Sequence, residues 1–121
     1  MPSRDDHLRQ AEHNLEFGES LDAVRYSDWI ATALFYAALH YVDAFLATKG
    51  HHPGRHDVRD GFVAREKELR PIHHHYRALK DSSRNARYYP PISFSATHLQ
   101  MLRTLHLEAI RSRLRPYIPI T

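Results

Sequence analysis

The chain of 121 residues contains no cysteine, and this absence removes several kinds of chemistry at once. Disulfide bridges, thiolate nucleophiles and cysteine-ligated zinc sites are all excluded. A chain of this length buries roughly two thirds of its unfolded surface, so it forms one core without such cross-links. We therefore expect a single domain over residues 1–121, and the composition is compatible with a reducing cytoplasm.

Long apolar runs and a large excess of charge are also missing. The longest apolar stretch, Trp29–Tyr41, is too short and too aromatic to span a bilayer, and no apolar run follows the N-terminus as in a signal peptide. We expect a soluble protein with no membrane contact. The 17 Lys and Arg against 14 Asp and Glu give a net charge of only +3, which permits a polyanion partner without requiring one. Arginine outnumbers lysine, which favours phosphate contacts.

The hydrophobic pattern has the period of helices throughout. No stretch alternates between apolar and polar residues as a half-buried strand does, so the sequence predicts an all-α fold, an up-and-down bundle of four to five helices. The third and fourth helices can form one rod kinked at Pro71. The expected helices run from Ser3 to about Gly18, from Tyr26 or Ser27 to Gly50, from Asp57 to Leu69, from Pro71 to about Tyr88, and from Ser95 to Pro116.

The second expected helix is apolar on almost its whole circumference. Its one polar sector holds Tyr36, His40 and Asp43, where Asp43 can accept a proton from His40. That pairing suits a satisfied core histidine and a catalytic imidazole alike. Because a small bundle covers only part of so apolar a helix, we expect a second copy of the chain to cover the rest. The sequence thus predicts a homodimer.

The eleven histidines raise the question of a metal site. Two groups of them are close together in the sequence, but consecutive residues on a helix point about 100° apart and do not converge on one ion. We therefore expect no metal and no cofactor. The two groups are His51, His52 and His56, and His73–His75.

One turn at the start of the third expected helix is a candidate phosphate contact. His56 and Arg59 lie three residues apart, so both side chains can leave the same face and hold a phosphate or an oxyanion together. The alternative is an ordinary exposed first turn of a helix.

The segment SSRNARYYP collects a second set of candidates at residues 82–90. Arg84 and Arg87 are followed by Tyr88 and Tyr89, and arginines beside aromatic rings suit an RNA backbone with unstacked bases. The alternative is that these cations stabilise the C-terminal end of a helix dipole. The same dipole explanation is favoured for Arg111, Arg113 and Arg115 near the end of the last helix.

Taken together, these segments resemble the HEPN domain family over roughly residues 5–115. The resemblance is carried by YSDWIATALFYAALHYVDAFLATKG, by His56–Arg59, by Tyr76 and Leu79, and by SSRNARYY. It implies a small helical bundle that is often dimeric and often encoded beside a nucleotidyltransferase-like partner or within defence systems. It also implies that active members are metal-independent endoribonucleases, which use an arginine separated by four to six residues from a histidine.

This chain departs from the family's catalytic motif. The motif begins with an arginine that is commonly followed by Asn or another polar residue, and Arg84 and Asn85 match this beginning. Tyr89, Pro90 and Pro91 occupy the positions where the histidine is expected, and none of these titrates near neutral pH. His56 and His40 are the candidates to replace it. His56 is preferred because it lies at a helix start rather than inside a core.

The sequence therefore predicts a HEPN-like homodimer that binds RNA in an arginine-lined groove. If it is active, we expect a metal-independent endoribonuclease of toxin or defence type. The alternative is a non-catalytic dimerisation and partner-binding module paired with a nucleotidyltransferase-like protein. The candidate catalytic residues are Arg84, His56 and Arg59, and the candidate nucleic-acid-binding residues are Asn85, Arg87, Tyr88 and Tyr89.

Overall fold

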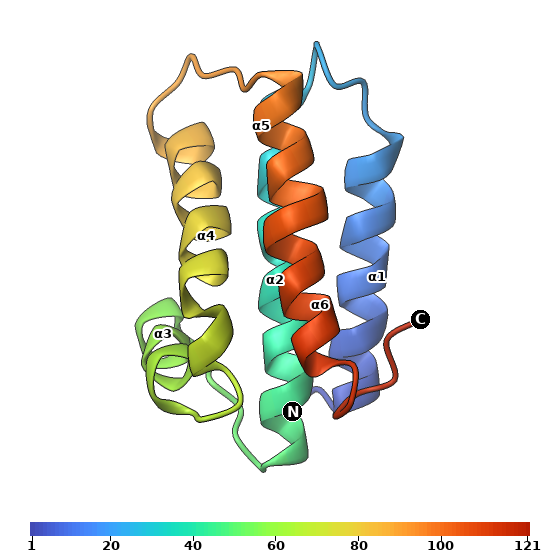
Figure 1. Ribbon diagram of the computed structural model, residues 1–121, viewed down its shortest axis with the longest axis vertical. Helices are drawn as coiled ribbons and strands as arrows, with labels where there is room; N and C mark the ends of the chain where they lie inside the picture. The colour runs from blue at the N-terminus through green and yellow to red at the C-terminus, as the bar shows by residue number, and fades with distance from the viewer.

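The computed structural model describes all 121 residues and consists of helices and their connections, without strands (Figure 1). Three long helices, α1, α2 and α4, run alongside a rod made of α5, η2 and α6, while α3 and η1 lie beside the start of α4. The all-α bundle expected from the sequence is confirmed. The elements are α1 (Arg4–Ser20), α2 (Ser27–Thr48), α3 (His56–Arg65), the 3-10 turn η1 (Arg70–Ile72), α4 (His73–Tyr88), α5 (Ala96–Met101), the π-helical η2 (Leu102–Leu107) and α6 (Glu108–Leu114).

Local capping signals fix several helix ends. The Ser3 hydroxyl accepts a hydrogen bond from the Asp6 N–H at 3.1 Å, and the Asp6 carboxylate accepts one from the Ser3 N–H at 2.9 Å. This reciprocal pair satisfies two N–H groups at the start of α1. Gly50, with a φ of 77°, adopts the left-handed conformation just after α2. The Ser95 hydroxyl caps α5 by accepting from the His98 N–H at 3.0 Å.

The third helix is shorter than expected, and the prediction of one kinked rod is wrong. Helix α3 ends at Arg65, and the chain turns back before Pro71 is reached. Lys49, just after α2, donates to Glu66 at 3.1 Å and to Glu68 at 3.0 Å. These two contacts hold the turn against the end of α2, so α3 and α4 are separate helices. Val58, an apolar residue in the first turns of α3, is 42% exposed.

Helix α2 is the central helix, and its own chain covers it. Sixteen of its 22 residues are buried, so the expectation that its apolar circumference needs a second molecule is wrong. Small residues explain the difference, because they let neighbouring helices approach closely. A Cβ placed on Gly18 of α1 would lie only 3.2 Å from the Cβ of Ala33.

By length and composition α2 could cross a membrane. However, 83% of its apolar window is buried inside the bundle, as in the core helix of a soluble protein. The main apolar surface that it leaves open is Trp29, which is 55% exposed.

Candidate functional site

The polar sector of α2 is paired with side chains from its neighbours. The Tyr36 hydroxyl accepts a hydrogen bond from Nη1 of Arg87, on α4, at 2.9 Å. Nδ1 of His40 lies 3.0 Å from Nδ1 of His7, on α1. The hydrophilic sector predicted from the sequence therefore links α2 to helices on both of its flanks.

Arg59 forms a buried ion pair with Asp43 of α2. Its Nε and Nη2 donate to the two carboxylate oxygens at 2.7 and 3.0 Å, and Nη2 also donates to the Pro53 carbonyl at 3.1 Å. The side chains of Arg59 and Asp43 are only 7% and 5% exposed. The hydrogen bonds of Arg59 are thus used inside the protein, where they hold α3 and the preceding loop on α2.

This ion pair corrects two expectations. Arg59 points into the core while His56 is exposed, so the two side chains do not share one outward face and do not form a joint phosphate site. Asp43, expected to accept a proton from His40, accepts both of its hydrogen bonds from Arg59 instead.

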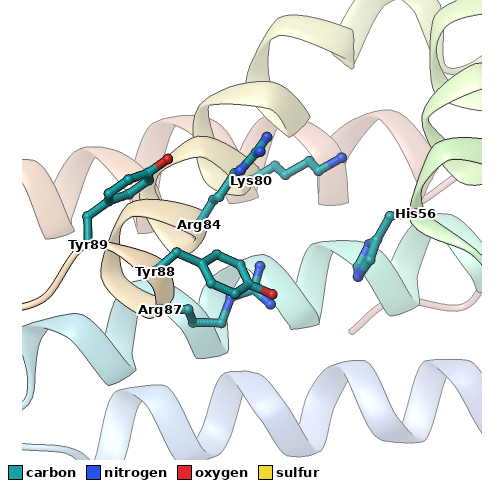
Figure 2. A pocket seen from close by; sticks show the side chains of 6 residues that line it. All are labelled: His56, Lys80, Arg84, Arg87, Tyr88 and Tyr89. Carbon is teal, nitrogen blue, oxygen red and sulfur yellow. The ribbon is translucent and has the colours of Figure 1, made fainter.

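A pocket of about 400 Å³ lies between the start of α3 and the C-terminal half of α4 (Figure 2). Five of the seven candidate site residues singled out in the sequence line it, whereas Arg59 and Asn85 do not. Lys80 also lines it and was not singled out, although it lies one turn before Arg84 on the same helical face. The lining residues are His56, Lys80, Arg84, Arg87, Tyr88 and Tyr89.

Arg87 is held in place by groups that do not neutralise its charge. Its Nε donates to the Ser83 carbonyl at 3.3 Å, in addition to the bond from Nη1 to Tyr36. The guanidinium carbon lies 5.4 Å from the centre of the Tyr36 ring and 5.1 Å from that of Tyr88. Cation–π contacts of this kind orient the side chain and leave it positively charged.

The pocket carries an excess of positive charge. Arg84 is exposed and pairs with no carboxylate, and Figure 2 shows its side chain pointing toward the same side of α4 as Lys80. Lys80 forms an ion pair with Asp60 of α3. Three cations therefore line a pocket in which only one of them has a carboxylate partner, and such a set attracts anions.

His56 contributes an imidazole to the same pocket. Its ring lies 6.2 Å from that of Phe35 and 6.5 Å from that of Tyr36. Although His56 is exposed, the protein around its ring removes part of its hydration and lowers its pKa, and the positive charges of Arg59 and Lys80 lower the pKa further. A lowered pKa keeps the imidazole neutral at pH 7, which is the form that can accept a proton.

The model of the HEPN domain family matches residues 5–109 of the 121-residue chain. The chain belongs to the HEPN domain family. The match runs from α1 to the start of α6 and contains every residue that lines the pocket. No curated protein and no solved structure is significantly similar to the chain. In this HEPN domain, the lining residue Tyr89 stands at the first position where the motif of active members has its histidine.

Proposed function

We propose that this HEPN domain binds single-stranded RNA in the cationic pocket between α3 and α4. The observation that supports it most strongly is the α4 face of Lys80, Arg84 and Arg87, in which Arg84 has no ion pair. Guanidinium groups bind phosphate in a planar, bidentate manner. Tyr88 and Tyr89 are 65% and 62% exposed beside these cations, and such rings stack with the unpaired bases of single strands.

Fluorescence anisotropy with a labelled single-stranded RNA tests this function. We expect binding at low salt that weakens steeply as salt is added, because phosphate contacts release counterions. The Tyr88→Leu variant should bind about tenfold more weakly through the loss of base stacking. Tyr117→Leu is the matched control, since Tyr117 is 44% exposed but packs on Phe45 at another part of the surface. Absence of binding even at low salt would contradict the proposal.

His56 also supports RNA cleavage at this pocket. A neutral His56 would accept the proton of a ribose 2′-hydroxyl, whose oxygen then attacks the adjacent phosphorus. The bond from phosphorus to the 5′-oxygen breaks, the leaving oxygen takes up a proton, and a 2′,3′-cyclic phosphate remains. Arg84 would stabilise the charge that develops on the phosphoryl oxygens. These steps require no metal ion.

The pH dependence of cleavage tests the role of His56. Because partial loss of hydration and nearby cations lower its pKa, the rate should rise with pH through a midpoint below 6.5 and then level off. Cleavage should persist with excess chelator and be lost in His56→Ala, whereas His13→Ala, which changes an exposed histidine of α1, should cleave normally. Binding without cleavage in the wild type would restrict the pocket to a binding role.

The open surface next to the pocket supports a second candidate function. Trp29 borders a depression that Ala86 and Arg87 of α4 also line, and exposed tryptophans are frequent at protein contacts. This surface suits the contact between two copies in a homodimer. It equally suits a non-catalytic module that binds a nucleotidyltransferase-like protein, and we place either complex in the cytoplasm. Light scattering should show a dimer that Trp29→Ala converts to a monomer. A wild-type monomer at high concentration would contradict the homodimer.

A further inference from the structure

Two histidines from different helices and one carboxylate converge where α1 passes α2. The Nδ1 atoms of His7 and His40 face each other at 3.0 Å. One ligand atom from each of His7, His40 and Asp43 lies within 4.8 Å of the other two. Imidazole nitrogen and carboxylate oxygen are ligands that zinc prefers. We propose that these three residues bind a Zn²⁺ ion that links α1 to α2.

The separation of the two nitrogens suits a shared ion. Zinc–nitrogen bonds of about 2.0–2.1 Å at a tetrahedral angle place two ligand nitrogens about 3.3 Å apart. The rings of His7 and His40 therefore need to part by only a few tenths of an ångström. Without the ion, one of the two facing Nδ1 atoms must carry a hydrogen to bond the other. Zinc binding shifts that hydrogen to Nε2 of the same ring, so no further reactant is needed.

Asp43 can still coordinate a metal ion while it is paired with Arg59. Arg59 donates one hydrogen bond to each carboxylate oxygen, and an ionised carboxylate has about four acceptor positions. Arg59 then orients the carboxylate in the way that outer-shell groups orient metal ligands. Its positive charge also opposes the ion, so we expect weaker binding than in a closed four-ligand zinc site.

His52 is an independent indication of a ligand at this place. Its Nδ1 is buried and has no hydrogen-bond partner, which is unfavourable unless another group bonds to it. Pro53, the next residue, accepts a hydrogen bond from the same Arg59 that pairs with Asp43, which places this loop near the proposed site. Structural zinc sites take four ligands, and we include His52 in the proposal as the candidate for the fourth.

A second histidine pair serves as a matched control. Nδ1 of His75 lies 3.0 Å from Nδ1 of His106, the same separation as in the pair formed by His7 and His40. No Asp or Glu completes a three-ligand group there. If two facing imidazoles were sufficient, both pairs would bind the ion equally.

Isothermal titration of the untagged, chelator-treated protein with Zn²⁺ tests the proposal. We expect one ion per chain, and at least a tenfold loss of affinity in His7→Gln and in His40→Gln but not in His106→Gln. Zinc at about a hundredfold excess over its Kd should raise the wild-type Tm by about 5–10 °C. Circular dichroism of each variant confirms that it is folded.

Co²⁺ provides a readout that needs no variant. In a tetrahedral set of nitrogen and oxygen ligands, Co²⁺ absorbs visible light far more strongly than the aqueous ion does. We expect such absorption at one equivalent of Co²⁺ and its loss when Zn²⁺ is added. The proposal is overturned if the wild type binds no zinc, or if His106→Gln weakens binding as much as His7→Gln does. Neither outcome depends on RNA, so this site and the RNA pocket are tested separately.

Discussion

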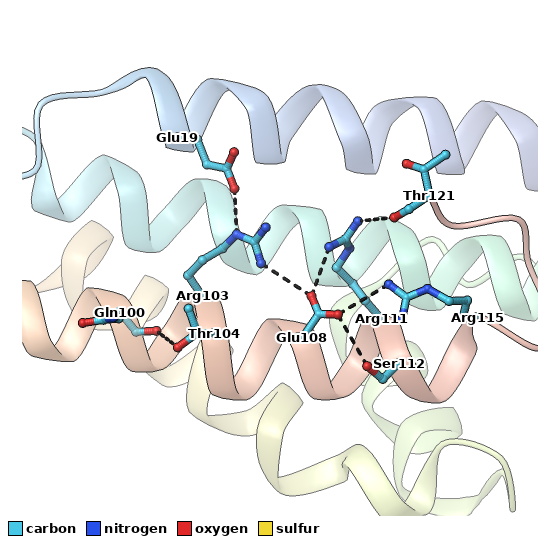
Figure 3. A network of polar contacts seen from close by, with 9 residues as sticks. All are labelled: Glu19, Gln100, Arg103, Thr104, Glu108, Arg111, Ser112, Arg115 and Thr121. Carbon is cyan, nitrogen blue, oxygen red and sulfur yellow. Dashed lines mark hydrogen bonds and ion pairs between the residues drawn. The ribbon is translucent and has the colours of Figure 1, made fainter.

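The arginines of the last helical rod and those of α4 differ in their access to a carboxylate. In the rod, Glu108 pairs with Arg103 at 3.6 Å, with Arg111 at 3.0 Å and with Arg115 at 3.4 Å (Figure 3). Arg103 also reaches Glu19 of α1 at 2.7 Å. On α4, in contrast, the two arginines that line the pocket pair with no acidic group.

This difference separates structural arginines from those able to bind a ligand. Arg111 donates to Glu108 and to the Thr121 carbonyl, at 2.9 Å, so it fastens the C-terminal residues to α6. Arg113 donates to the Glu68 carbonyl at 2.8 Å. These contacts go beyond the helix-dipole role expected from the sequence. Position near a helix end is thus a poor guide to what an arginine does, and the location of the acidic groups is a better one.

Arg59 provides the strongest test of the conclusion that an arginine paired with a carboxylate is structural, because its partner Asp43 is buried. Arg59→Met leaves the Asp43 charge uncompensated, which should lower the free energy of unfolding by about 3–5 kcal/mol. Urea denaturation measures the loss, and the double variant Arg59→Met, Asp43→Asn should recover part of it. A stable Arg59→Met protein with weakened RNA binding would show instead that Arg59 contacts a ligand.

Charge reversal compares the two arginine groups directly. Arg84→Glu should weaken RNA binding on the order of 100-fold at low salt, because it removes a phosphate contact and adds a repulsive charge. Arg115→Glu changes the net charge equally, but Arg115 already pairs with Glu108. The affinity of the Arg115→Glu variant for RNA should stay within about threefold of the wild-type affinity. Equal losses in anisotropy titrations would mean that net charge, rather than the α4 pocket, determines binding.

Features encoded within one helix were predictable from the sequence. Ser3 and Ser95 cap helices through residues only three positions away, so both starts were predicted. Arg84, Arg87 and Tyr88 share a helical face by spacing alone, and the same spacing would have identified Lys80.

Features that depend on how helices pack were not predictable. His7 and His40 are 33 positions apart, so no local pattern joins them. The inward direction of Arg59 depends on how α3 is rotated against α2, which places its guanidinium on Asp43. The coverage of α2 depends equally on close contacts such as that between Gly18 and Ala33. A helical wheel shows which side of a helix is apolar, but it does not show how many neighbours cover that side.

Substituting Glu108 tests the same comparison from the acidic side, because it removes the carboxylate instead of an arginine. Glu108→Gln removes the charge that three arginines share, and we expect a loss of about 1 kcal/mol in stability. The estimate is small because Glu108 is 37% exposed and solvent screens its ion pairs. RNA affinity should not change. A substantial gain in affinity would indicate that the freed arginines of the rod also bind RNA.

The salt dependence of binding gives the finest comparison. For single strands, each phosphate contact contributes about 0.7 to the slope of log affinity against log salt concentration. Arg84→Ala should therefore reduce that slope by about 0.7. Arg103→Ala should leave it unchanged, because Arg103 is neutralised by Glu19 and Glu108. A lower affinity with an unchanged slope in Arg84→Ala would mean that Arg84 acts by stacking or by shaping the pocket, and then the missing carboxylate would not explain its role.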